Sequence, residues 1–270
     1  MKTIREEQIG QLTFRLVQVG SEVCGMVLGT PAGRIGPICR PDADQVWRQL
    51  HEEVGKANRK YFGLDGATAR FLRFFPQGFG SADYFREERD YKDKAKKKLD
   101  ANVPLAEAVT GSGFGEAVLS IFNATNLLSP FEKTRLRPFL RGSSADAFIR
   151  AAANFTQNAD AAALHEMERV LRPHDCAKWT IVTYLPFLWR PDVHMFLKPQ
   201  VTQDFAERIN HRFQFDYKAN LDLGVYESLL DMVVQTERAL IDLRPRDRID
   251  VQSFIWVVGP YNEVADAPKT

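Results

Sequence analysis

Two stretches near the start of the chain, Leu12-Thr-Phe-Arg-Leu-Val-Gln18 and Val23-Cys-Gly-Met-Val-Leu28, decide the fold, and Gly20-Ser21 lies between them. In the first stretch apolar and polar residues alternate with a period near two, which is typical of strands, and a Gly-Ser pair suits a hairpin turn. A second glycine-containing break at 29–33 precedes a short apolar segment at 34–38. The sequence therefore predicts a three-stranded antiparallel meander that needs a cover on its apolar face.

The next segment predicts that cover. Asp42 followed by Gln45 resembles a capping box, and a proline precedes the cap. Apolar residues then recur at helical spacing, at Val46, Trp47, Leu50 and Val54. We expect a helix over 43–58 whose apolar side lies on the sheet.

The remainder of the chain is mainly helical by pattern. The most polar helix is expected over 82–100. The segment 178–198, which is divided by prolines and rich in β-branched and aromatic residues, favours two strands or one strand and one helical end, and residues 249–258 suit either helix or strand. The predicted fold class is α+β: an N-terminal antiparallel β-meander with a covering helix, followed by a mainly helical body with a small strand-like insertion. We predict an N-terminal α+β region over 1–100 and a mainly helical region over 101–270, or a single domain, since no linker marks the boundary.

Composition narrows the class of protein. The chain has 270 residues, of which 44% are hydrophobic and 26% charged, and 36 Lys and Arg against 35 Asp and Glu give a formal charge of +1. These values exclude a wholly disordered chain and a histone-like polycation. Three cysteines without CxxC spacing do not predict a disulfide framework. The first residues lack the apolar core of a signal peptide, and the longest apolar stretch has about 11 residues, short of a membrane span. We expect a cytoplasmic protein without a membrane partner.

A catalytic hypothesis comes from Asp90-Tyr-Lys92. An acidic residue, a spacer and a lysine form half of a pattern that metal-dependent nucleases use, in which carboxylates hold Mg²⁺ and the lysine positions water. Asp83, or Asp65 further back, supplies a first carboxylate. The triplet lies in a helical pattern, however, whereas such enzymes usually carry it on a strand. Mg²⁺ is expected only if this alternative holds, and the sequence otherwise predicts no cofactor.

Two further constellations are weaker. His174-Asp175-Cys176 is the densest group of metal-ligand residue types, but only the distant His194 could extend it toward the four ligands that zinc requires, so no metal site is predicted. The glycines of 111–115 lack the Lys-Ser/Thr of a phosphate-binding loop and follow a helical segment, so we expect a helix break there.

Clustered cations favour nucleic-acid binding without catalysis. The helix over 82–100 carries lysines next to aromatic residues, although acidic residues interleave them. A second cluster, within 135–141, contains no acidic residue. The candidate nucleic-acid-binding residues are Lys96, Lys97, Lys98, Arg135, Arg137 and Arg141.

The leading hypothesis is a non-enzymatic cytoplasmic accessory protein that contacts nucleic acid, or a partner bound to nucleic acid, through basic helices. The alternatives are the Mg²⁺-dependent nuclease and a pure protein-interaction subunit with exposed aromatic anchors. For Phe187, Trp189, Phe254 and Trp256, core packing is the favoured interpretation. Arginines of 135–141 that share a face with Lys96 and Lys97 would favour nucleic acid, whereas arginines that point into acidic neighbours would favour the interaction subunit.

Overall fold

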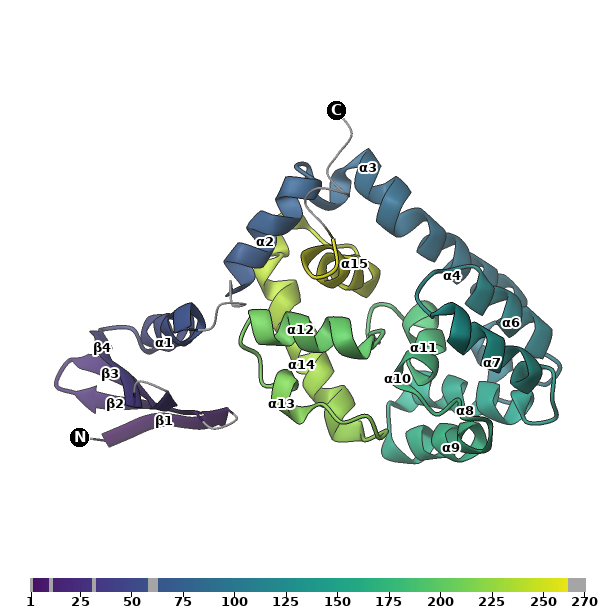
Figure 1. The fold of residues 1–270 in the computed structure, drawn as a ribbon, viewed down its shortest axis with the longest axis horizontal. Coiled ribbons are helices and arrows are strands. Elements are labelled where there is room, and N and C mark those ends of the chain that lie inside the picture. Colours follow the sequence, from purple (N-terminus) through teal and green to yellow (C-terminus); the bar gives the residue numbers. More distant parts are fainter. Residues whose placement is uncertain (1, 10–11, 31–32, 58–62, 262–270) are drawn as a thin grey trace. The chain divides into compact units, whose positions relative to one another are not determined.

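The computed structural model describes residues 2–9, 12–30, 33–57 and 63–261 (Figure 1). The chain divides into two compact units. Unit 1 comprises Met1–Ala67 and Gln203–Asp216, and unit 2 comprises Thr68–Thr202 and Tyr217–Thr270. An antiparallel sheet is followed by a mostly helical body, so the α+β class is confirmed. Residue 100, where the sequence analysis placed a boundary, lies in unit 2 inside helix α4 (Asp90–Asn102).

The sheet of unit 1 has four strands in the order β1-β2-β3-β4, one more than the sequence predicts. They are β1 (Lys2–Ile9), β2 (Leu12–Val19), β3 (Glu22–Thr30) and β4 (Gly33–Arg40). The predicted hairpin turn is present, with Val19 paired to Glu22 and a positive φ of 62° at Gly20. Strand β1 escaped the pattern analysis because four of its eight residues are charged and they break the alternation.

Helix α1 (Ala43–Ala57) covers the sheet as the sequence predicts. The buried residues between them are Phe14, Leu16, Val23, Val27, Val46, Leu50 and Val54. Gly25 allows the close approach of the helix, since a Cβ there would lie 2.6 Å from side-chain atoms of Leu16, Val46 and Leu50. Burial of each large apolar side chain stabilises the unit by about 1.5–3 kcal/mol.

A disulfide joins Cys24 and Cys39, which lie directly opposite each other on β3 and β4. Three cysteines without a spacing motif did not predict it, because the link depends on strand register and not on sequence spacing. The third cysteine, Cys176, is free and buried.

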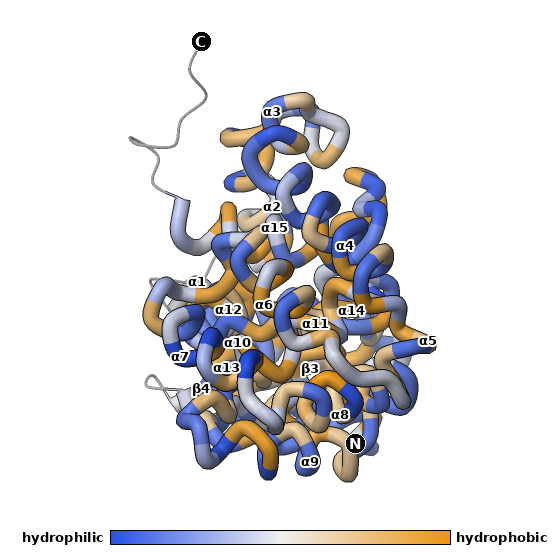
Figure 2. Tube along the Cα trace, turned by 90° about the vertical axis from the view of Figure 1, so that its right-hand side faces the viewer, coloured by the Kyte–Doolittle hydropathy of each residue, from blue (hydrophilic) through white to orange (hydrophobic). Residues whose placement is uncertain are grey.

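Unit 2 is built from helices that begin within α2 (Gly63–Phe74) and end with α15 (Arg248–Val258). The predicted polar helix over 82–100 forms as α3 (Ala82–Tyr84), the π-helical turn η2 (Phe85–Arg89) and α4, and α4 carries mainly hydrophilic residues (Figure 2). Further helices are α5 (Leu105–Ala108), α6 (Gly115–Asn123), α7 (Pro130–Leu140), α8 (Ala145–Asn158), α9 (Ala161–Leu171), α10 (Trp179–Val182), α11 (Tyr184–Trp189) and α14 (Leu223–Ala239). Short 3-10 turns are η1 (Gly78–Gly80), η3 (Arg172–His174) and η4 (Ile241–Leu243). Two helices lie in or across the second segment of unit 1: α12 (Pro199–Arg208) and α13 (Phe213–Asp216).

The strand-like insertion predicted over 178–198 is wrong. Residues 179–182 and 184–189 form α10 and α11, and 193–198 have no strand structure. Every residue from 179 to 189 is buried, so the segment is apolar on all sides and shows no helical period in its sequence. Packing on all sides overrides the strand propensity of its β-branched residues. Among the described residues, no helix is long and apolar enough to cross a membrane.

Candidate functional site

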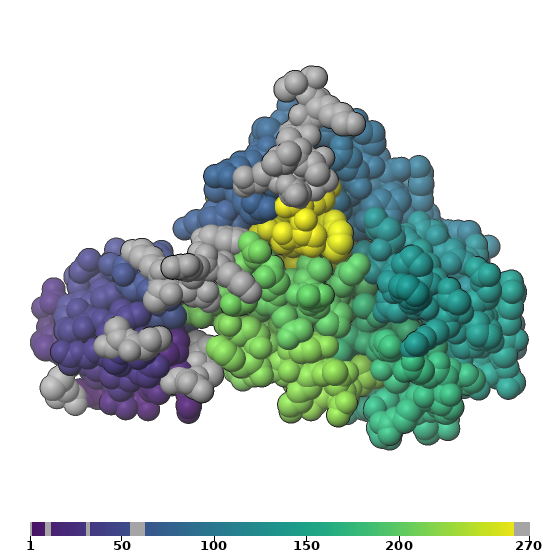
Figure 3. All heavy atoms as spheres, viewed as in Figure 1, coloured from purple at the N-terminus to yellow at the C-terminus, as the bar shows by residue number. Residues whose placement is uncertain are grey.

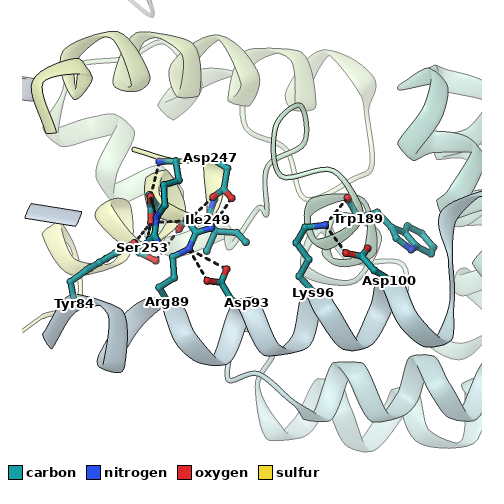
Figure 4. Close-up of polar contacts among 11 residues, drawn as sticks. Tyr84, Arg89, Asp93, Lys96, Asp100, Trp189, Asp247, Ile249 and Ser253 are labelled. Atoms are coloured by element: carbon teal, nitrogen blue, oxygen red, sulfur yellow. Dashed lines mark hydrogen bonds and ion pairs between the residues drawn. The ribbon is translucent and has the colours of Figure 1, made fainter. Parts of the chain in front are cut away.

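The helix that carries the predicted catalytic residues is widened by one turn of π-helix, a feature often found at functional sites. Ser81 caps the start of this helix by accepting a hydrogen bond from the Tyr84 amide. The π-turn brings two successive charged residues, Glu88 and Arg89, to the buried side of the helix. One turn later Lys92 is buried on the same side, with no exposed surface. This places charged side chains against α15 (Figure 4).

The buried charge cluster comprises Tyr84, Glu88, Arg89, Lys92, Asp247, Asp250 and Ser253. Its first half consists of the contacts that Arg89 makes. The Arg89 guanidinium donates to both carboxylate oxygens of Asp247 at 2.7 Å, lies 2.8 Å from Asp250 Oδ1 and donates to Asp93. Burial acts against a charge on Arg89, but the two aspartates outweigh it and raise its pKa. Although burial alone would raise the pKa of Asp250, Arg89 holds that pKa below its ordinary value.

Lys92 holds the second half. Its Nζ donates to Ser253 Oγ at 2.7 Å and to Glu88 Oε2 at 3.3 Å, and Ser253 Oγ donates onward to the Ile249 carbonyl. Burial lowers the pKa of Lys92 to about 8, although Glu88 acts in the opposite direction. Tyr261 donates to the other oxygen of Glu88 at 2.7 Å. A lysine and a serine at this distance resemble a nucleophile and its base.

The burial of the cluster argues for a structural role. Lys92, Asp250 and Ser253 have no exposed surface, so a substrate could reach Ser253 Oγ only after α15 separates from α4. Each carboxylate of the cluster already pairs with a cation of the cluster: Asp247 and Asp250 with Arg89, and Glu88 with Lys92. We conclude that the buried charge cluster cross-links the two helices.

The three residues of the nuclease hypothesis have different partners. Asp83 pairs with Arg86 at 2.6 Å and its side chain is about half exposed. Asp90 pairs with Lys94, and Lys92 points to the opposite, buried side. Within the part of the chain that the structure describes, no group of three or more His, Cys, Asp or Glu residues could hold a metal ion.

The three candidate lysines also point in different directions. Lys96 Nζ donates to the Trp189 carbonyl at 3.2 Å, toward α11 (Figure 4). Lys98 donates to Ser120 in α6, and Lys97 between them is exposed. The lysines therefore do not form a single basic face.

Two of the three candidate arginines point into acidic neighbours. Arg135 pairs with Asp175, which lies in the loop after η3, and Arg141 pairs with Glu116 of α6. Arg137 is exposed and makes no hydrogen bond or ion pair with the described part of the chain. By the criterion set from the sequence, this arrangement favours a protein-interaction subunit.

Helix α7, which carries these arginines, is a firmly held element at the surface of unit 2 (Figure 3). Ser129 and Glu132 form a reciprocal capping box at its start. Glu132 also accepts from Thr180, which turns its carboxylate inward. The inner side of the helix packs in the core through Leu136, Phe139 and Leu140.

The outer side of α7 exposes the largest single apolar surface among the described exposed hydrophobic residues. Phe131 is 83% exposed. It lies seven residues before the exposed Pro138, so two turns of the helix align both side chains. We call the outward residues of this helix and its C-cap the α7 face: Phe131, Thr134, Arg135, Arg137, Pro138 and Arg141.

Phe131 is not among the candidate residues from the sequence, although the helical spacing after Ser129 indicates that it is exposed. A helical projection from the cap at Ser129 places Phe131 opposite the apolar stripe of α7. The aromatic residues that it did single out lie elsewhere: Phe187, Trp189 and Phe254 are buried, in agreement with the favoured core interpretation. An exposed phenylalanine is recognised only when its helix has been placed.

The remaining sequence candidates have local structural roles. Both ring nitrogens of His194 are used in the core, by Tyr226 Oη and the Thr156 carbonyl. The glycines of 111–115 form the expected break between α5 and α6, where the Gly113 amide donates to the Asp146 carboxylate. Comparison with known proteins found no matching family model, no matching curated protein and no matching solved structure. The functional assignment therefore depends on the geometry of this chain.

Proposed function

We propose that this chain is a non-enzymatic accessory protein that binds a protein partner through the α7 face. One observation carries the proposal: a phenylalanine stands 83% exposed on a capped, well-packed helix. Covering a large aromatic ring removes apolar surface from water and is a common source of binding energy at protein interfaces. A helix held by its cap and its core residues loses little conformational entropy on binding.

The ion pairs of the arginines support a protein partner over nucleic acid. Asp175 and Glu116 reduce the positive potential around Arg135 and Arg141. Nucleic-acid binding depends on an excess of positive charge that follows the phosphates. Here two of the three candidate lysines, Lys96 and Lys98, are turned toward other helices, and that excess is small.

Nucleic acid remains the second candidate because of two exposed cations. Arg137 on α7 and Lys97 on α4 are both exposed, and Phe131 offers a flat ring on which a base could stack. Under this alternative the α7 face would bind a single strand, directly or together with a protein already bound to it.

A cytoplasmic location belongs to the same proposal, and the cysteine pair tests it. Cytoplasmic thiols are normally kept reduced. Alkylation of Cys24 and Cys39 in intact cells, followed by mass spectrometry, distinguishes free thiols from the disulfide. Free thiols support a cytoplasmic location, and a persistent disulfide contradicts it.

Selection of displayed peptides tests the proposed function. A random 16-residue library is selected on the wild-type chain with counter-selection on Phe131→Ser, and Ile241→Ser, which removes another strongly exposed apolar residue, serves as control. We expect peptides that bind the wild type and the Ile241 variant but bind the Phe131 variant about 10- to 100-fold more weakly. If no peptide depends on Phe131 while labelled single-stranded DNA binds with a steep salt dependence, the nucleic-acid alternative replaces the proposal.

A further inference from the structure

The α7 face itself carries cations and no anion, although Asp175 and Glu116 of neighbouring elements pair with two of its arginines. Its six residues include three arginines and no carboxylate. The one acidic residue of the helix, Glu132, is bound by Ser129 and Thr180 and does not face the solvent side. A partner that covers Phe131 and extends toward the C-terminal end of α7 therefore meets guanidinium groups.

The arginines can exchange their present partners at small cost. The side chains of the Arg135–Asp175 pair are 53% and 69% exposed, and those of the Arg141–Glu116 pair are 56% and 67% exposed. Ion pairs this exposed contribute little to stability, because water and salt screen them. Guanidinium groups pair carboxylates in bidentate fashion, so a partner carboxylate can replace or join the present one.

The α7 backbone adds an acceptor. Pro138 has no N–H, so the usual hydrogen bond from that position to the Thr134 carbonyl is missing. Thr134 and Pro138 both lie on the α7 face, between Phe131 and Arg141. An N–H group of a partner can satisfy this carbonyl.

We propose that the partner of the α7 face is a protein with an acidic segment, whose carboxylates pair with Arg135, Arg137 and Arg141 around an apolar pocket that takes Phe131. This inference rests on the proposed function and adds the chemistry of the partner to it. Charge complementarity favours the acidic segment: three arginines and no carboxylate share the face with the apolar anchor, and one of them, Arg137, has no partner in the described part of the chain. Arg137 and Arg141 are four residues apart, about 6 Å along the helix, which suits two carboxylates one helical turn apart.

The test uses the most enriched displayed peptide and a synthetic copy in which every Asp and Glu is replaced by Asn and Gln. Binding of both to the full chain is measured by fluorescence anisotropy at two salt concentrations. We expect an excess of acidic residues in the enriched peptides, and at least about 10-fold weaker binding of the amide copy and of Arg137→Glu. Arg169→Glu on α9, an exposed arginine outside the α7 face, is the control and should leave binding unchanged.

The outcomes separate the two proposals. Peptides that require Phe131 but bind equally well as amide copies overturn the acidic partner and leave the proposed function standing. Absence of any Phe131-dependent peptide overturns both. Displacement of the acidic peptide by single-stranded DNA that itself binds more tightly, and that also loses affinity with Arg137→Glu, identifies phosphate as the preferred anion and overturns the acidic protein segment.

Discussion

Removal of the Arg89 guanidinium should strongly destabilise unit 2. In Arg89→Met, both Asp247 contacts at 2.7 Å and the 2.8 Å contact with Asp250 are lost, while a side chain of similar length fills the space. Asp247 is partly exposed and can regain water, but Asp250 has no exposed surface. The variant therefore leaves one fully buried carboxylate without its closest cation.

The size of the effect follows from what remains around Asp250. Breaking a buried ion pair costs about 3–5 kcal/mol. The Tyr84 hydroxyl at 2.6 Å and the Arg246 amide at 2.8 Å still donate to Asp250, so we expect the lower end, about 3 kcal/mol. With a urea dependence of about 3 kcal/mol per molar, the unfolding midpoint should fall by about 1 M.

The pH dependence gives a second, independent readout. Arg89 holds the pKa of Asp250 below its ordinary value, so this stabilisation is present above the ordinary aspartate range and is lost as pH falls through the folded-state pKa. In Arg89→Met the largest effect that opposes burial is gone, so the pKa of Asp250 should rise relative to the wild type, although Tyr84 and Arg246 remain, and the carboxyl should become neutral at a higher pH. The difference in stability between wild type and variant should therefore shrink between pH 7 and pH 4.

Urea titrations followed by hydrogen exchange of the α15 amides measure both effects in unit 2. Arg86→Met, which removes an exposed arginine from the same helix, is the control and should leave the midpoint unchanged. A second variant, Asp250→Asn in the Arg89→Met background, should recover part of the loss. A cost below about 1 kcal/mol at pH 7, or a cost independent of pH, would refute the conclusion that the cluster cross-links α4 and α15.

Two further perturbations test the buried lysine and the disulfide. Lys92→Met should lower the free energy of unfolding by about 3–5 kcal/mol because buried Glu88 loses its cation, and adding Glu88→Gln should restore most of that loss. Equal losses of stability in the single and double variants would contradict this. Burial lowers the pKa of Lys92 to about 8 from 10.5, so the unfolded state binds more protons between these two pH values. The contribution of Lys92 to the free energy of unfolding should therefore become more favourable as pH rises through that window, which thermal denaturation of the wild type and the double variant measures. A stability difference between the two proteins that does not change with pH would contradict this. Replacing Cys24 and Cys39 together by serine should lower the unfolding free energy of unit 1 by about 3 kcal/mol, as expected for a 15-residue loop, and unfolding with and without reductant checks this; a wild type indifferent to reductant would argue against the link.

The sequence predicted those parts of the fold in which one face is apolar and the other polar. The alternation in β2 and the spacing in α1 marked each element and its buried side. The segment 178–198 failed for the opposite reason: α10 and α11 are buried on all sides, so their apolar run has no period to separate helix from strand. The disulfide could not be predicted from the sequence either. The register of β3 and β4 brings the two sulfurs together, and the spacing of Cys24 and Cys39 does not indicate that register.

For the candidate residues too, local sequence patterns predict the helix but not the burial or the long-range partners of a side chain. A charged residue in a helical pattern is normally solvated, so the pattern predicts Lys92 in an exposed or catalytic set, whereas in the structure Lys92 follows the π-turn and is buried in the core. The arginines of 135–141 were correctly placed on a helix, but their acidic neighbours come from α6 and from the loop after η3, far away in sequence. Long-range pairing of this kind has no local signature.

Buried Lys92 and exposed Phe131 are opposite exceptions to the rule that charged side chains are exposed and apolar ones buried, and the difference between them bears on the proposed function. Proteins break such local rules mainly at functional sites and compensate for the cost elsewhere in the chain. The charge of Lys92 is compensated inside the chain by Glu88 and Ser253, so the cluster already has everything that it needs. The exposed ring of Phe131 has no such compensation among the described residues, although its helix is capped and tightly packed on the other side. Under the proposed function a second molecule covers this ring, because burial of a phenylalanine side chain removes apolar surface from water, and we expect that molecule to bind at the α7 face.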